Sequence, residues 1–158
     1  MATKQVSGMI VAGAAIAVIL ANMEASDRAP APARPGPDCA ALSTDDIRAF
    51  FQHTPCRTLH RTAHTTTLDN GAVVAVSVIR VGFPTEQQAA AFQALHRIHG
   101  NGDIEPAALP THPGLRYTAL NYGSTRTGTT VTFAETEAIS GTVDAPTLDA
   151  IAERAARR

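Results

Sequence analysis

The sequence is poor in aromatic and basic side chains. It has no tryptophan, and aromatic residues make up 4% of its 158 residues. Lysine occurs only at position 4, and the formal net charge is −1. A nucleic-acid-binding domain normally carries a basic stripe. The composition therefore argues against a nucleic-acid partner and predicts a light core of Val, Ala, Leu and Ile.

Common sequence motifs of enzymes are also missing. The chain has no Gly-x-Ser-x-Gly elbow, no phosphate-binding loop, no dinucleotide fingerprint and no His-Glu-x-x-His pair. These absences lower the expectation of catalysis without excluding it. No cofactor is expected.

A long uncharged run lies near the N-terminus. Val6–Met23 is free of charged side chains, and its strictly apolar part is Met9–Ala21. The shorter segment suits a signal peptide, and the full run just reaches the length of a membrane-spanning helix. Lys4 before the run favours an N-terminus that stays in the cytoplasm. Residues 1–25 are therefore expected to be a membrane anchor or, alternatively, a cleaved signal peptide, with the remaining chain exported.

The next segment is a linker. Residues 26–38 contain four prolines and no large apolar side chain. Such a composition cannot form a core and favours an extended, semi-rigid spacer. Residues 39–158 are expected to form the folded extracytoplasmic domain.

The two cysteines, Cys39 and Cys56, bracket a short helical pattern. Ser43 is the expected N-cap, acidic residues follow in the first turn, and Pro55 ends the helix. In an exported protein this arrangement predicts a disulfide. A catalytic thiol is the alternative, and it would need a nearby activating base.

The stretch from Asn70 to Gly100 has the clearest pattern. Asn70-Gly71 separates two strand-like runs, Arg57–Leu68 and Val73–Phe83, and predicts a hairpin. The second run is apolar on both faces, as in a central strand. A helix then begins at Thr85, where Gln88 fits a capping box, and Gly100 is the expected C-cap.

A similar pattern recurs toward the C-terminus. A long loop, Asn101–Gly114, precedes a third strand over Leu115–Tyr122, a turn over Gly123–Gly128 and a fourth strand over Thr129–Ile139. A last helix follows Gly141–Asp144. The distance from turn to helix is fourteen positions in both halves, which indicates either a duplication or a coincidence. We expect an α+β fold with two ββα units in one antiparallel sheet.

Four histidines are candidate metal ligands. His60 and His64 share one face of the first strand, and His96 and His99 share one side of the long helix. If that helix covered that strand face, the imidazoles would suit zinc or copper. Solvent exposure of the strand pair and helix-dipole interactions of the helix pair are the favoured explanation, so no metal is assigned.

Two acidic patterns are also present. Asn101, Asp103 and Glu105 alternate in a loop, as in calcium-binding loops, but they supply too few oxygens and suit a surface turn. Glu135 and Glu137 share a face of the fourth strand, which suits either an acid–base pair or two solvated residues.

Short motifs in the second half also carry a resemblance. They are Phe83-Pro84-Thr85 before an alanine-rich helix, Gly100–Ile104, Arg116-Tyr117-Thr118 and Tyr122–Arg126. Over Pro84–Ala156 at most, the chain resembles uncharacterised small exported or membrane-anchored proteins of high-GC actinobacteria. The resemblance implies an exported α+β domain and brings no catalytic residue with it.

These observations favour a membrane-tethered extracytoplasmic binding, sensory or protein-interaction module. Its partner is expected to be a protein or a small molecule, which contacts the long loop and the second hairpin. The candidate contact residues are Asn101, Asp103, Glu105, Tyr117, Tyr122 and Arg126. A small secreted enzyme or metal-binding protein that uses the histidines is one alternative. A structural envelope component that self-associates through the first strand is another.

Overall fold

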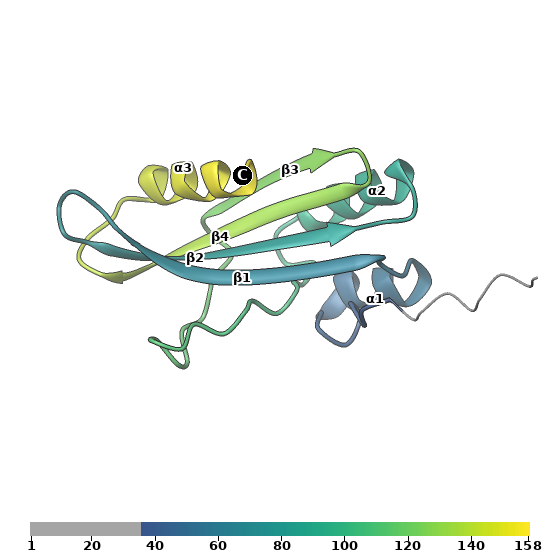
Figure 1. The fold of residues 1–158 in the computed structure, drawn as a ribbon, viewed down its shortest axis with the longest axis horizontal. Coiled ribbons are helices and arrows are strands. Elements are labelled where there is room, and N and C mark those ends of the chain that lie inside the picture. Colours follow the sequence, from purple (N-terminus) through teal and green to yellow (C-terminus); the bar gives the residue numbers. More distant parts are fainter. Residues whose placement is uncertain (1–35) are drawn as a thin grey trace, which may run out of the picture. The chain divides into compact units, whose positions relative to one another are not determined.

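The computed structural model describes residues 36–158, and a sheet of four antiparallel strands in the order β1-β2-β4-β3 lies at its centre (Figure 1). The strands are β1 Thr58–Thr67, β2 Val73–Gly82, β3 Tyr122–Thr127 and β4 Thr130–Ser140. The helices are α1 Asp45–His53, α2 Glu86–His96 and α3 Ala145–Ala156. This arrangement confirms the α+β expectation and the ββα–ββα order.

The predicted anchor, residues 1–25, and most of the predicted linker, residues 26–38, lie outside the described residues. Within residues 36–158, no helix is both long enough and apolar enough to cross a membrane.

The first hairpin forms where the sequence predicts it. Gly71 has a φ of +80°, and the side chain of Asn70 accepts a hydrogen bond of 3.0 Å from the backbone of Ala72. β1 pairs with β2 in the register that this turn sets, from Thr67 opposite Val73 onward. β2 lies between β1 and β4, which confirms that it is a central strand.

The third strand differs from the prediction. Residues 115–121 belong to the long loop, and β3 occupies the segment that was predicted to be a turn. Gly123 lies in this strand opposite Ala134, and a Cβ there would overlap the backbone of α3 at Ala152 and Glu153. The glycine is therefore needed for close packing, and the hairpin turn is made at Gly128, whose φ is +56°.

Helix α1 is held by the predicted Cys39–Cys56 disulfide. Its N-cap is Thr44 and not Ser43. The Ser43 side chain is buried and donates instead to the carbonyl oxygen of Cys39 at 2.6 Å. The Thr44 side chain makes no capping bond because it accepts from the backbone N–H of Asp103 at 3.0 Å.

Helix α2 begins at the predicted cap and ends earlier than predicted. The Thr85 hydroxyl accepts from the backbone of Gln88 at 3.2 Å, while the side-chain oxygen of Gln88 has no partner among the described residues. The capping box is therefore half formed. The last helical residue is His96, and Gly100, with a φ of +95°, lies beyond the helix in the following turn.

The two faces of the sheet are packed differently. Odd-numbered residues of β2 and β4 meet α1, α2 and the long loop, and all five phenylalanines lie in this layer. Even-numbered residues of the same strands face α3, where the core is aliphatic and small. α2 and α3 thus cover opposite faces, so the two ββα units are not arranged as symmetric copies.

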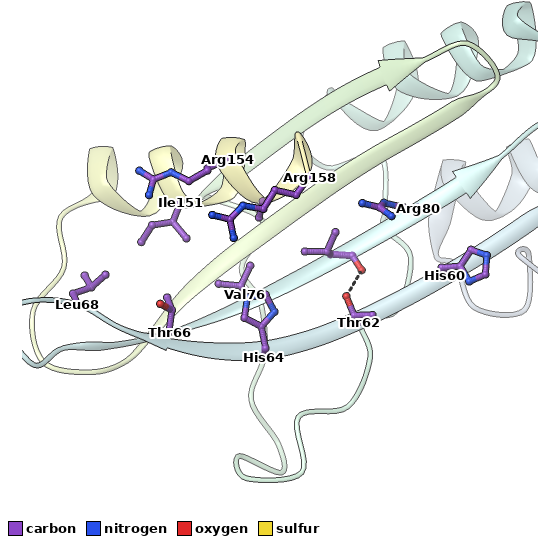
Figure 2. A pocket seen from close by; sticks show the side chains of 12 residues that line it. His60, Thr62, His64, Thr66, Leu68, Val76, Arg80, Ile151, Arg154 and Arg158 are labelled. Carbon is purple, nitrogen blue, oxygen red and sulfur yellow. Dashed lines mark hydrogen bonds between the residues drawn. The ribbon is translucent and has the colours of Figure 1, made fainter.

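Helix α3 packs over β3 and β4 and reaches only part of β2. Beside it, the uncovered side of β1 and β2 forms a groove of about 370 Å³ (Figure 2). His60 and His64 lie on the β1 wall of this groove, whereas α2 lies on the opposite face of the sheet. The four histidines would converge only if α2 covered the strand face that carries His60 and His64, and it does not.

Candidate functional site

A large cavity of the described domain lies between the long loop and β4. Its volume is about 660 Å³, and residues from Asp103 to Tyr117 form most of its wall, with Glu135 of β4 on its floor. We call this space the loop cavity. Its size is within the usual range of small-molecule sites, about 300–1,000 Å³.

The first part of the loop is fixed to the segment that carries α1. Thr44 and Asp103 are joined by two hydrogen bonds, one from each backbone N–H, and Ser43 forms an isolated β-bridge with Ile104. Ile104 is fully buried in the main core. On the other side, Arg61 of β1 donates to the carbonyl oxygen of Glu105 at 2.6 Å. These contacts hold residues 103–105 of the loop, which line the loop cavity, in place.

The second part of the loop is attached differently. Between residues 107 and 115, the hydrogen bonds of the described chain are internal to the loop, as from His112 N to Leu109 O at 2.9 Å. The chain is tied to the sheet again at Thr118, whose backbone and hydroxyl both donate to Glu137. We call residues 107–116 the arch, because both of its ends are anchored and its middle is not.

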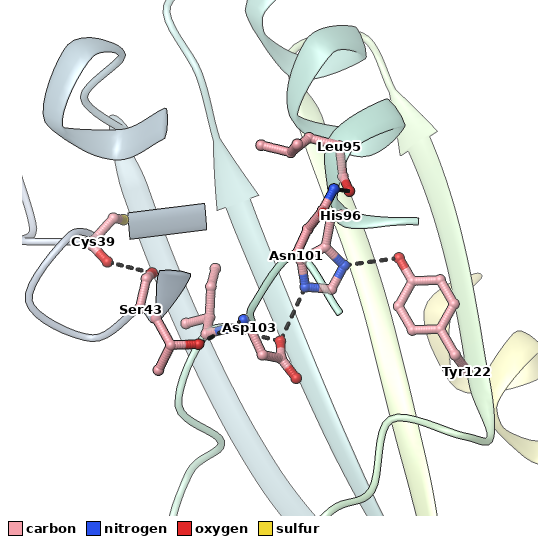
Figure 3. A network of polar contacts seen from close by, with 9 residues as sticks. Cys39, Ser43, Leu95, His96, Asn101, Asp103 and Tyr122 are labelled. Carbon is pink, nitrogen blue, oxygen red and sulfur yellow. Dashed lines mark hydrogen bonds and ion pairs between the residues drawn. The ribbon is translucent and has the colours of Figure 1, made fainter. Parts of the chain in front are cut away.

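A chain of polar contacts links α2, the long loop and β3 (Figure 3). The imidazole of His96 stands between Asp103 and Tyr122, with 3.0 Å from Nε2 to the Asp103 carboxylate and 3.1 Å from Nδ1 to the Tyr122 hydroxyl. The ring packs on Phe133 with 4.0 Å between ring centroids. Position 96 faces this cluster because it is one turn after Phe92 on the buried side of α2.

The carboxylate of Asp103 is ionised in this setting. Burial by itself would raise its pKa, but interactions with the side chains of His96 and Glu135 and with the N–H of Ile104 outweigh burial and lower it. A carboxylate only accepts hydrogen bonds, so Nε2 of His96 carries a proton and donates it to Asp103. In the neutral imidazole, Nδ1 is then the acceptor for the Tyr122 hydroxyl.

Glu135 has the opposite protonation behaviour. It is 3% exposed, and burial, its hydrogen-bonding interaction with Asp103 and the charges of Asp103 and Glu137 raise its pKa to about 9. The group is therefore a neutral carboxylic acid at neutral pH. Sequence reasoning left open whether this residue was solvated, and the structure shows that it is buried. The neighbour that controls it most is Asp103 and not Glu137.

Two buried polar atoms at this floor have no partner within residues 36–158. They are Oε1 of Glu135 and the hydroxyl oxygen of Tyr117. Burial raises the pKa of Tyr117 to about 12, together with the charges that Glu135 and Glu137 carry at such alkaline pH, so the phenol stays protonated at neutral pH. An unpaired buried polar atom costs about 1–3 kcal/mol. Both residues line the loop cavity, but these two atoms are shielded from solvent, so a bound polar group reaches them only when the side chains shift.

The same reasoning limits the chemistry of Tyr122. Burial and the charges of Asp103 and Glu135 raise its pKa to about 12. The hydroxyl is therefore a hydrogen-bond donor to His96 and a poor nucleophile. The Asp103–His96–Tyr122 chain positions these side chains rather than activating one of them.

The predicted contact residues separate into four groups. Asp103, Glu105 and Tyr117 line the loop cavity, and Tyr122 lines a smaller one of about 120 Å³ on the other side of Glu135. Asn101 is committed to the fold, since its amide donates to the carbonyl oxygen of Leu95 at 3.2 Å.

Arg126 is separate from both cavities. It lies at the tip of the second hairpin and donates to Gly128. The alternating acidic pattern of the loop does not converge, because Asp103 faces His96 while Glu105 is exposed. Within residues 36–158, no three His, Cys, Asp or Glu side chains are grouped so that they could hold a metal ion.

Sequence reasoning did not identify His96 and Glu135 as parts of one site. Both were noticed, but each was grouped with a neighbour in sequence, His99 or Glu137. The sequence did contain one indication that Glu135 is buried: it lies on the same strand face as the apolar residues Val131 and Phe133. Comparisons of the chain with protein-family models, with curated proteins and with solved structures found no match.

Proposed function

We propose that residues 36–158 form an extracytoplasmic binding module that holds a small molecule with an amino group and an apolar body in the loop cavity. The observation that carries this proposal is the unpaired, buried Oε1 of Glu135 beside the ionised carboxylate of Asp103. An acceptor in this position suits a hydrogen-bond donor from a ligand, and an ammonium group is a donor with the complementary charge.

The lining supports the same ligand class. The arch contributes apolar side chains and prolines, among them Leu109, Pro110 and Leu115, and the acidic groups lie at the floor. Ligand sites are usually built in this way, with apolar walls and a few polar groups that fix orientation. An amine with an apolar chain would place its nitrogen at Glu135 and its carbon chain against the arch.

Binding of a cation would also change the protonation of the site. A positive charge next to a buried carboxyl group favours the ionised form of that group. The module would therefore release a proton from Glu135 when an amine binds at neutral pH. The proton release can be measured by titration calorimetry in buffers that differ in ionisation enthalpy.

The direct test compares hexylamine with hexanol, which have the same chain and different head groups. Calorimetry with the purified, disulfide-bonded protein should detect binding of hexylamine and no binding of hexanol. Glu135→Leu should abolish binding, while Glu153→Gln, which removes an acidic group from the opposite face, should leave it unchanged. Equal affinity for the alcohol, or undiminished amine binding by the Glu135→Leu protein, would refute the proposal.

We also propose that the domain is exported and tethered to the membrane by residues 1–25. The Cys39–Cys56 disulfide supports an oxidising compartment, and the uncharged run Val6–Met23 supports an N-terminal anchor or signal peptide. Protease added to intact cells should digest the domain if it is outside. Protection of the domain until the cells are lysed would contradict export.

Acid–base catalysis is a second candidate function. The observation that favours it is the carboxyl pair, because one neutral and one ionised carboxyl group side by side can act as an acid and a base. A catalytic role predicts turnover of a bound amine derivative that is lost in both Glu135→Gln and Asp103→Asn. A pure binding role predicts that Glu135→Gln still binds, since the amide keeps an acceptor oxygen and a donor to Asp103.

A further inference from the structure

We infer a second ligand site, independent of the loop cavity, in the groove between α3 and the β1–β2 hairpin, and its ligand is a single-chain fatty acid. The basic groove, as we call it, has three arginines: Arg80 on β2, Arg154 in the last turn of α3, and Arg158 two residues beyond the end of that helix (Figure 2). It lies on the opposite face of the sheet from Glu135 and has the opposite charge.

The floor of the groove is apolar. Val76 is buried and Val78 half-buried, and Ile151 of α3 and Leu68 extend the apolar surface along the groove. This strip stays open because α3 packs over β3 and β4, where Gly123 permits close approach, and does not reach β1. An apolar strip of this kind in a concave site suits an alkyl chain.

The rim of the groove is basic and unneutralised. Among residues 36–158, Arg80, Arg154 and Arg158 make no ion pair and no side-chain hydrogen bond, and no acidic side chain lines the groove. Arg157, by contrast, pairs with Glu153 at 3.4 Å and does not line it. Guanidinium groups bind carboxylates through paired N–H donors. The same helix end thus carries two free arginines toward the groove and one paired arginine elsewhere.

The shape of the groove selects the ligand class. A volume of about 370 Å³ lies at the lower end of the range for small-molecule sites, which suits one alkyl chain and not the two chains of a membrane phospholipid. A nucleic acid would need a longer basic stripe that follows its phosphates. A ligand with one anionic head group and one alkyl chain fits both the basic rim and the apolar floor. The head group would contact the arginines, and the alkyl chain would lie over Val76 and Val78.

The test is calorimetry of the purified full chain with dodecanoate below its micelle concentration. We expect binding of one dodecanoate per chain, and no comparable binding of dodecyl maltoside, whose head group is uncharged. Arg154→Gln and Arg158→Gln should each weaken binding about tenfold, since a charge-assisted hydrogen bond is lost. Both side chains are exposed, so neither change should affect folding.

Arg157→Gln is the matched control, because it removes the same charge from the same helix end and should leave dodecanoate affinity unchanged. Ile151→Ser tests the contact with the alkyl chain. It should weaken the binding of dodecanoate and leave the affinity for acetate unchanged. The inference is overturned if inorganic phosphate binds as tightly as dodecanoate, if Arg157→Gln is as damaging as Arg154→Gln, or if only anionic phospholipid vesicles bind. Glu135→Leu should not change dodecanoate affinity, so failure here is distinguishable from failure at the loop cavity.

Discussion

Asp103 and Glu135 form a carboxyl pair that holds one proton at neutral pH. Asp103 is kept ionised by His96 and by the N–H of Ile104, while burial and the neighbouring charge keep Glu135 neutral. The pair joins the anchored part of the long loop to the central strand β4. A change in the protonation of either carboxyl group should therefore affect both the position of the long loop and the floor of the loop cavity.

The first prediction concerns stability as a function of pH. The pKa of Glu135 is raised from 4.5 to about 9 on folding, so the folded state binds this proton more tightly than the unfolded state. Its contribution is fully present below pH 4.5 and is lost progressively as pH rises toward about 9. Glu135→Gln should therefore stabilise the protein at pH 8, with little gain at pH 4, in urea unfolding curves. Equal stabilisation at both pH values would show that the side chain is not buried as an acid.

The second prediction concerns the arch. Replacing Ala107–His112 by a Gly-Ser segment of equal length removes the apolar wall without cutting any hydrogen bond to the sheet. The loss of unfolding free energy should be at most about 1–2 kcal/mol, from added chain entropy. Binding of hexylamine should be abolished. A much larger loss of stability would show that the arch is part of the core.

The third prediction concerns the contact between β3 and α3. Gly123→Ala places a methyl group against the backbone of Ala152 and Glu153, so α3 must move away from the sheet. Overpacking of this kind costs about 1–3 kcal/mol. Thermal unfolding of Gly123→Ala and of Thr127→Ala, an exposed control position in the same strand, should show the loss only at position 123. An unchanged midpoint for Gly123→Ala would contradict the close approach.

The fourth prediction concerns the disulfide. Cys39 and Cys56 are 17 positions apart and enclose α1, and a loop of this size stabilises by about 3 kcal/mol in the chain-entropy model. The double substitution Cys39→Ala/Cys56→Ala should lower the unfolding free energy by this order. It should also weaken the binding of hexylamine in the loop cavity, because the backbone of Thr44 next to α1 holds Asp103. Unchanged hexylamine affinity of the double variant would show that the disulfide and the loop cavity are uncoupled.

Local signals in the sequence determined the first hairpin, the start of α2 and the disulfide. Asn70-Gly71 supplies a turn, Thr85 supplies a cap, and the only two cysteines of the sequence have only each other as partners. Each of these features depends on chemistry within a few residues or on a count of residue types. They were predictable for that reason.

The tertiary structure decided where β3 begins, what Glu135 does and where the histidines lie. Gly123 looks like a turn residue until α3 is seen against it, and Glu135 looks solvated until the loop that carries Asp103 covers it. His64 and His96 are both candidate metal ligands in the sequence, but they lie on opposite faces of the sheet. Burial, pKa and the grouping of side chains depend on packing between distant segments. The sequence alone therefore specified the framework of this protein, and packing specified both of its candidate sites.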